Sequence, residues 1–171
     1  MSFQKLFPEK PLIGMIHMPP LPGAPGNTRS MKEFTDFALS EADKLEGAAL
    51  DACIVENVGD TPLFKENLPP YSVAAMALVT RKVVEHTRTK VGVNTLRNAC
   101  EEALSVAHVA GGQFIRCNVL IGSGISLANI RKFYDRSDGI ITGEPDFKVG
   151  GVWGGPSDAK AYAKAVRLCR H

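Results

Sequence analysis

The chain has 171 residues, a hydrophobic content of 44% and a formal net charge of +2. This balance predicts one soluble globular domain over residues 1–171, and the absence of a basic block argues against a nucleic-acid partner. No apolar run reaches the roughly 18 residues of a membrane-spanning helix, and the first eight residues contain no long apolar segment of a secretory signal. We therefore expect no membrane span and a cytoplasmic location, with an organelle as the alternative.

Apolar runs alternate with amphipathic segments along the whole chain. The apolar runs predict five strands, over residues 11–17, 51–57, 90–96, 113–121 and 138–142. The amphipathic segments predict five helices, over residues 31–47, 72–86, 99–110, 127–134 and 158–169. Repeated βα units of this kind predict an α/β fold with parallel strands and outer helices. A closed (β/α)₈ barrel has eight units and typically about 250 residues, so about five of eight units predict an incomplete barrel.

Local signals predict the ends and faces of these helices. Ser30 with Glu33 forms a capping-box pattern, Asn98 with Glu101 resembles another, and Ser157 is expected to cap the last helix. Helical spacing predicts core-facing positions, which are Met31, Phe34, Phe37, Ala38, Ala42 and Leu45, then Cys100, Ala103, Leu104, Ala107 and Ala110, then Ala159, Tyr162, Val166 and Cys169. The cysteines lack metal-ligand spacing, which predicts reduced, buried thiols at Cys53, Cys100, Cys117 and Cys169.

Polar residues stand at the carboxyl ends of the predicted strands, where parallel α/β proteins gather their functional groups. The candidate catalytic residues are His17, Glu56, Asn94, Arg116 and Asn118. Burying a lone carboxylate is costly, so Glu56 is either an acid/base or ligand-binding group or the structural partner of Arg116. Arg116, which is predicted to share a strand face with Asn118, either binds an anionic substrate or only pairs with Glu56. His17 is either a site residue or a hydrogen-bond partner of the proline-rich loop that follows it.

A second group of residues predicts a phosphate site. Gly122, Ser123 and Gly124 follow an apolar strand and precede a predicted helix, where backbone N–H groups favour an anion. The next strand ends at Thr142 and Gly143, and in phosphate-binding barrels the last two βα loops commonly build the phosphate site together. Ordinary tight turns are the alternative. No set of metal ligands stands out, and the sequence names no cofactor.

Several motifs together resemble the BtpA family, which includes SgcQ-like proteins. They are IGMIHMPPLPG at 13–23, VENVGD at 55–60, GVNTLRN at 92–98 and FIRCNVL at 114–120, with shorter matches at 122–124, 129–130 and 138–141. The resemblance implies a TIM-barrel-like fold. It also implies a family named for a role in photosystem I biogenesis in cyanobacteria, whose members occur in non-photosynthetic organisms as well.

The order of these motifs departs from the family pattern. In the family, the strand resembling 114–120 is followed by further βα units before the strand that carries the GSG sequence, whereas here Leu120 runs directly into Ile121. The shortfall of about 80 residues equals two to three βα units. We interpret this as an internal deletion with its junction near 119–122. Unpaired strand edges would then favour a homo-oligomer.

Two function classes remain open at this point. One is a TIM-barrel enzyme, inactive or active in this short form, that binds a phosphorylated or sugar-like small molecule. In that case Glu56 would do acid/base work and Arg116 would stabilise negative charge. The other is a non-enzymatic assembly or biogenesis factor, which would use the exposed loops over 19–25 and 59–70 to contact a partner.

Overall fold

The computed structural model of the chain describes residues 3–7, 9–64, 67–117, 127, 130–131, 140–142, 147–149 and 156–170. In chain order, the elements are α1 (Phe3–Leu6), β1 (Leu12–His17), α2 (Met31–Gly47), β2 (Ala52–Glu56), α3 (Pro70–His86), β3 (Lys90–Asn94), α4 (Cys100–Ala110), β4 (Phe114–Ile115), β5 (Ile140–Thr142) and α6 (Ala159–Arg170). Strands and helices alternate, which confirms the predicted α/β fold.

The described strands form one parallel sheet in the order β4-β3-β2-β1-β5. Strands that follow one another along the chain are neighbours, and the last strand, β5, pairs with the first, β1. A closed (β/α)₈ barrel has the same neighbour relations, because its last strand returns to its first. The sheet order therefore agrees with the TIM-barrel-like arrangement that the sequence predicts.

Both faces of the sheet are covered, which explains why the strands are nearly continuous apolar runs. Alternate residues point to opposite faces. One set packs in the main core with the helices and consists of Leu12, Ile16, Cys53, Val55, Val91 and Val93. The other set forms a smaller cluster with Phe7 of the amino-terminal segment and consists of Ile13, Met15, Ala52 and Ile54. In a (β/α)₈ barrel the helices lie outside the strands. We therefore call the helix-covered face of the sheet the outer face and the face with the smaller cluster the inner face.

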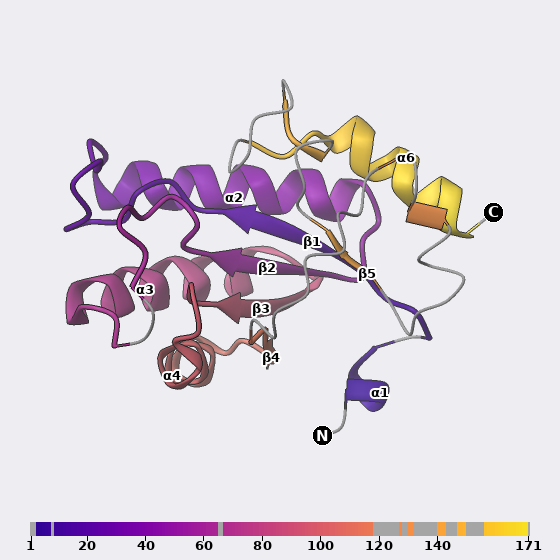
Figure 1. The fold of residues 1–171 in the computed structure, drawn as a ribbon. Coiled ribbons are helices and arrows are strands. Elements are labelled where there is room, and N and C mark those ends of the chain that lie inside the picture. The colour runs from indigo at the N-terminus through magenta and orange to yellow at the C-terminus, as the bar shows by residue number, and fades with distance from the viewer. Residues whose placement is uncertain are drawn as a thin grey trace.

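The outer helices follow the sheet in sequence order. Figure 1 shows α2, α3 and α4 one after another along the strands, with α6 beside α2. The predicted capping box at the start of α2 is confirmed, because the Ser30 hydroxyl accepts from the Glu33 N–H and the Glu33 carboxylate accepts from the Ser30 N–H. Four of the six predicted core positions of α2 are buried, namely Phe34, Ala38, Ala42 and Leu45. The other two, Met31 and Phe37, are partly buried and pack against this core.

Other helix predictions are wrong in detail. α4 has Ala99 as its N-cap without a side-chain hydrogen bond, so Asn98 does not form the predicted capping box. Leu104 was expected in the core but is 60% exposed, because it lies on the side of α4 that faces away from the sheet. At α6 the capping carboxylate belongs to Asp158, which accepts from the N–H groups of Lys160 and Ala161. α3 also begins at Pro70, two residues before the predicted start.

Two further expectations concern the fourth strand and the cysteines. The strand covers only Phe114–Ile115 among the described residues, and Arg116 follows it. Cys53 and Cys169 are buried as expected, whereas Cys100 is half-buried and Cys117 is exposed, so burial was the wrong prediction for Cys117. The predicted helix over 127–134 and the predicted junction near 119–122 lie largely or wholly outside the described residues. Within the described ranges, every helix is too short or too polar to cross a membrane.

Candidate functional site

Three of the predicted site residues end three neighbouring strands. His17 is the last residue of β1, Glu56 of β2 and Asn94 of β3. The strand registers pair His17 with Glu56 and Glu56 with Asn94. Residues in the same register of parallel strands point to the same face, so the three side chains form a row at the carboxyl edge of the sheet. Their positions alternate with Ile16, Val55 and Val93, which places them on the inner face.

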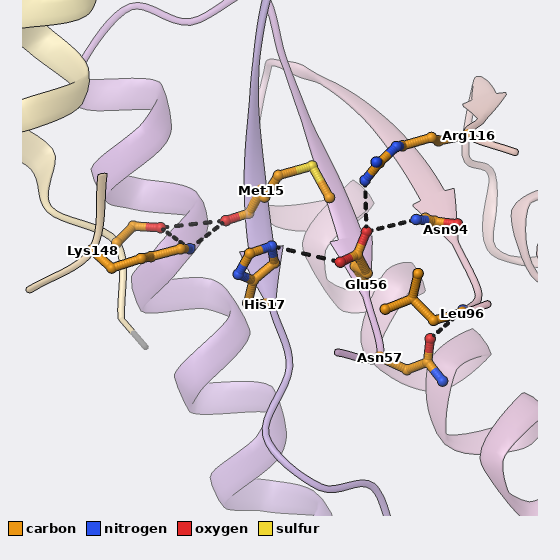
Figure 2. Close-up of polar contacts among 9 residues, drawn as sticks. Met15, His17, Glu56, Asn57, Asn94, Leu96, Arg116 and Lys148 are labelled. Carbon is orange, nitrogen blue, oxygen red and sulfur yellow. Dashed lines mark hydrogen bonds and ion pairs between the residues drawn. The ribbon is translucent and has the colours of Figure 1, made fainter. Parts of the chain in front are cut away.

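Glu56 is the centre of this row (Figure 2). Its Oε2 accepts a hydrogen bond from Asn94 Nδ2 at 2.6 Å and another from Arg116 Nη1 at 3.0 Å. Its Oε1 lies 3.6 Å from His17 Nε2. The Glu56 side chain is only 4% exposed, whereas the Arg116 side chain is 38% exposed. Arg116 is therefore the member of the cluster that solvent, and any bound molecule, reaches most easily.

The backbone explains how Arg116 arrives at Glu56. β4 pairs with β3 at Phe114 and Ile115, and the Arg116 N–H then donates to the Val93 carbonyl at 2.9 Å. The chain thus stays alongside β3 up to Arg116. The Arg116 side chain then reaches past β3 to the carboxylate of Glu56 on β2. Of the two alternatives that the sequence left open for Glu56, this contact shows the pairing with Arg116.

Burial governs the protonation of the two ionisable groups at the centre. Desolvation raises the pKa of Glu56, and the charge of Arg116 and the hydrogen bond from Asn94 oppose that rise. Desolvation also lowers the pKa of His17 to about 3, with further lowering by the charges of Lys148 and Arg116. His17 is therefore a neutral imidazole at pH 7. The carboxylate has a higher affinity for a proton than an exposed glutamate has.

Two further polar residues hold the loops around the row. Asn57 Oδ1 accepts from the Leu96 N–H at 2.6 Å, and its Nδ2 donates to Asp60 Oδ2 at 3.1 Å. Asp60 Oδ1 in turn accepts from the Leu21 N–H at 2.8 Å. This chain of hydrogen bonds connects the loops that follow β1, β2 and β3. Asn57 and Asp60 thus position the loops, and their hydrogen bonds do not involve Glu56.

One charged residue next to the site, Lys148, was not predicted from the sequence. Lys148 is 2% exposed, and its Nζ donates to the Met15 carbonyl at 3.1 Å and to Ser157 Oγ at 3.3 Å (Figure 2). Lys148 lies in a segment that the sequence marks only as a glycine-rich loop. The one local signal is its position between Phe147 and Val149, a lysine flanked by two large apolar residues. That pattern is too common to single it out.

The remaining predicted residues fall mostly outside the described part of the chain. Thr142 ends β5 and pairs in register with Gly14 of β1. The other calls, for Asn118, Gly122, Ser123, Gly124 and Gly143, lie outside the described residues. Among the residues that are described, no cluster of three His, Cys, Asp or Glu side chains could hold a metal ion.

Comparison with known proteins identifies the family. The sequence model of the BtpA family matches residues 8–122, which include β1 to β4 and the row of His17, Glu56 and Asn94. The chain belongs to the BtpA family. The predicted resemblance to this family is thereby confirmed.

Relatives of this BtpA-family chain occur in different organisms, as three examples show. An uncharacterized protein of Methanocaldococcus jannaschii is 43% identical over 117 residues, which are 68% of this chain and 44% of that protein. The photosystem I biogenesis protein BtpA of Synechocystis is 36% identical over 120 residues, 70% of this chain and 42% of that protein. An uncharacterized mitochondrial protein of Caenorhabditis elegans is 37% identical over 123 residues, 68% of this chain and 44% of that protein. No solved structure matches the chain.

The BtpA-family match has limited coverage on both sides. The chain spans less than half the length of the curated relatives it matches. The match ends at residue 122, next to the junction that the order of the motifs predicts. The internal deletion itself stays a prediction. Lys148 and α6 lie outside the matched residues, although they pack against the matched part.

Proposed function

We propose that this BtpA-family chain binds a phosphorylated or sugar-like small molecule at the carboxyl edge of its sheet, as an enzyme or as a descendant of one. The observation that carries the proposal is the buried Glu56 carboxylate, which ends β2 in register with His17 and Asn94 and is paired with a partly exposed arginine. The raised pKa of Glu56 and its place at the carboxyl end of a parallel strand, where α/β proteins gather their functional groups, favour a role in chemistry.

Each residue of the row has a definite task in this proposal. Glu56 gives and takes a proton, because its raised pKa moves it toward the neutral pH at which acid/base catalysis is most efficient. Arg116 stabilises negative charge on the ligand through its exposed guanidinium edge. Asn94 fixes the rotamer of Glu56 by its hydrogen bond. His17 is neutral, so its ring carries no positive charge that would pair with the Glu56 carboxylate.

The phosphate group of the ligand would lie at the other predicted cluster. The sequence predicts that Gly122, Ser123 and Gly124 would supply backbone N–H groups together with Gly143, which follows Thr142 in the sequence. Thr142 ends the strand next to β1. Because β5 pairs with β1, a loop that follows Thr142 starts close to the strand that carries His17. This proximity supports a single ligand that spans the end of β5 and the Glu56 row.

Thermal stabilisation of the full chain tests the phosphate part of the proposal, with inorganic phosphate and simple sugar phosphates as probes. A ligand at about ten times its Kd adds about 1.4 kcal/mol, which raises Tm by about 3–5 °C in a protein of this size. We expect the shift to disappear in Gly124→Asp, since the new carboxylate repels the anion. Arg88→Gln is the control, because Arg88 is an exposed arginine of the loop before β3. An equal shift in wild type and Gly124→Asp would refute the site.

A second candidate function rests on the name of one relative. The Synechocystis relative is called a photosystem I biogenesis protein, which supports a role for this chain as an assembly factor. The surface that would serve it is a pocket of about 210 Å³ between the loops after β1 and β2, lined among others by Pro25, Pro62, Phe64 and Tyr71. Phe64 and Tyr71 are both about half-exposed. Reproducible capture of one partner, abolished by Tyr71→Ser, would favour this function, whereas turnover of a sugar phosphate would reject it.

A further inference from the structure

The buried Lys148 belongs to the surroundings of the Glu56 row although no part of the proposed function uses it. It follows β5, on the opposite side of β1 from β2. Its Nζ donates to the carbonyl of Met15, two residues before His17 on the same strand. The neighbouring Ser157 hydroxyl lies 3.4 Å from the same carbonyl, and the Ser157 N–H donates to the carboxylate of Glu41. The lysine is thus fixed against β1 by a built set of partners.

We propose that Lys148 is a positioning residue of this site that acts through its charge, so that the buried ammonium favours the ionised form of Glu56 and the neutral form of His17 from the far side of β1. This role of Lys148 rests on the proposed function only in its consequence for catalysis. The electrostatic coupling itself can be tested without any ligand.

A buried ammonium is a costly donor for one carbonyl oxygen and one hydroxyl, even with the charge of Glu41 nearby. A serine hydroxyl or an amide could donate to Met15 without the cost of removing a full charge from water. A charge in a weakly polar interior acts over longer distances than one at the surface. The charge of Lys148 lowers the pKa of His17 and also opposes the rise in the pKa of Glu56. The position therefore has an effect on the row that an uncharged donor would not have.

Lys148 is itself able to change its charge near neutral pH. Burial lowers its pKa to about 8, while Glu41 and Glu56 oppose the lowering and Lys44 adds to it. Glu41 and Lys44 of α2 and Glu56 of β2 act on the charge of Lys148, and this charge acts on His17 of β1. Tyr162 of α6 shares Met15 and Ser157 with Lys148 as partners. Below about pH 8 the ammonium is present and favours an ionised Glu56. Above it this support is lost.

An NMR titration of the wild-type full chain tests the coupling directly. The ¹³C resonances of His17 Cε1, Glu56 Cδ and Lys148 Cε are followed from pH 6 to 10. If Lys148 acts on the row, the His17 and Glu56 signals show a step whose midpoint equals that of Lys148, near pH 8. A Lys148 step without a matching step at both His17 and Glu56 would overturn the proposal, and this outcome needs no variant to fold.

Two substitutions then separate charge from hydrogen bonding. Lys148→Gln keeps a donor for the Met15 carbonyl but removes the charge, so the pKa of Glu56 should rise and the step near pH 8 should vanish. Lys148→Arg keeps the charge without titrating, so the pKa of Glu56 should stay near the wild-type value. An unchanged Glu56 in Lys148→Gln would also overturn the proposal.

Ser157→Ala is the matched control for packing. This substitution removes a hydrogen-bond partner of Lys148 but leaves the charge of Lys148 in place. The pKa of Glu56 should therefore stay near its wild-type value. The phosphate-shift experiment is independent of these measurements. A missing phosphate shift together with an intact step at pH 8 would reject the proposed function and keep the electrostatic role of Lys148.

Discussion

His17 and Glu56 meet at the ends of β1 and β2, and burial favours the uncharged form of both. For His17 this means a pKa of about 3 instead of 6.5, and for Glu56 a pKa above its ordinary value. The two shifts have opposite effects on stability as the pH falls. Protonation is favoured in the unfolded chain at His17, whereas the folded chain holds the proton of Glu56 more tightly. A measurement on the wild type alone would show only their sum.

Replacing His17 by glutamine separates the two contributions. The unfolded chain binds the His17 proton below about pH 6.5 and the folded chain only near pH 3, so the histidine makes the fold less stable as the pH falls through this window. At about 1.4 kcal/mol per pH unit, the wild type should lose about 3 kcal/mol relative to His17→Gln between pH 6.5 and pH 4. Urea unfolding of both proteins at several pH values measures this difference. Two parallel curves would show that His17 is not desolvated.

The row itself was predictable from the sequence, and its surroundings were not. His17, Glu56 and Asn94 each end an apolar run, and parallel strands bring such ends together, so local patterns were enough to group them. Lys148 contacts a residue 133 positions away, and no pattern within its own segment indicates that contact. Periodicity in a sequence identifies elements, whereas the burial of a single charge is decided by which elements pack together.

At the scale of elements, the loops after β1 and β2 are in close backbone contact. The Met18 N–H donates to the Glu56 carbonyl at 2.8 Å, and the Gly59 N–H donates to the Met18 carbonyl at 3.0 Å. A Cβ atom on Gly59 would lie 2.6 Å from backbone atoms of Met18, Pro19 and Pro20. The glycine therefore permits the two loops to approach, which in turn holds the carboxyl ends of both strands beside each other.

Gly59→Ala should destabilise the protein by about 1–3 kcal/mol, because the backbone atoms it meets cannot move without breaking the contact between the loops. Gly47→Ala is the control, since nothing lies within 4 Å of the added methyl group and alanine is the better helix former at the end of α2. It should leave stability unchanged or raise it slightly. Chemical denaturation of the two variants checks both expectations. Equal stabilities would mean that the loops are not held together at Gly59.

Errors in the predicted helix ends have one physical cause. Ser157 fits the local signature of a cap, but the fold places it against Glu41 and Met15, and the adjacent Asp158 caps α6 instead. Asn98 fits the same signature, and α4 starts after Ala99 all the same. A capping pattern records which residue could satisfy the free N–H groups. Contacts with the rest of the chain decide which residue does.

At the scale of the whole molecule, the carboxyl-terminal segment returns to the amino-terminal half. β5 pairs with β1, and α6 packs beside α2 (Figure 1). Arg170 forms an ion pair with Asp51. The residues of this segment lie outside the part that matches the family, yet they supply members of the main core. β4 and β5 are the outer strands of the described sheet, and the homo-oligomer through such edges stays a prediction.

Tyr162→Ala tests whether α6 folds together with the family-matched part. The ring of Tyr162 is fully buried, and its centroid lies 5.0 Å from that of Phe147. Removing a buried aromatic ring lowers the free energy of unfolding by about 3–5 kcal/mol. If the core is shared, the whole protein should be destabilised by this amount. Leu168→Ala is the control on the same helix, because Leu168 is partly exposed and its loss should cost little.

The measurement is thermal unfolding followed at two places at once, by circular dichroism for the helices and by the NMR signals of β1 and β2. One cooperative unit predicts that both signals of Tyr162→Ala move to the same lower midpoint, since the core that connects α2 and α6 is weakened as a whole. Loss of helical signal with an unchanged midpoint for β1 and β2 would show that α6 is an appendage. In that case Lys148, which lies between β5 and α6, could not be fixed firmly enough against Met15 to act on the Glu56 row.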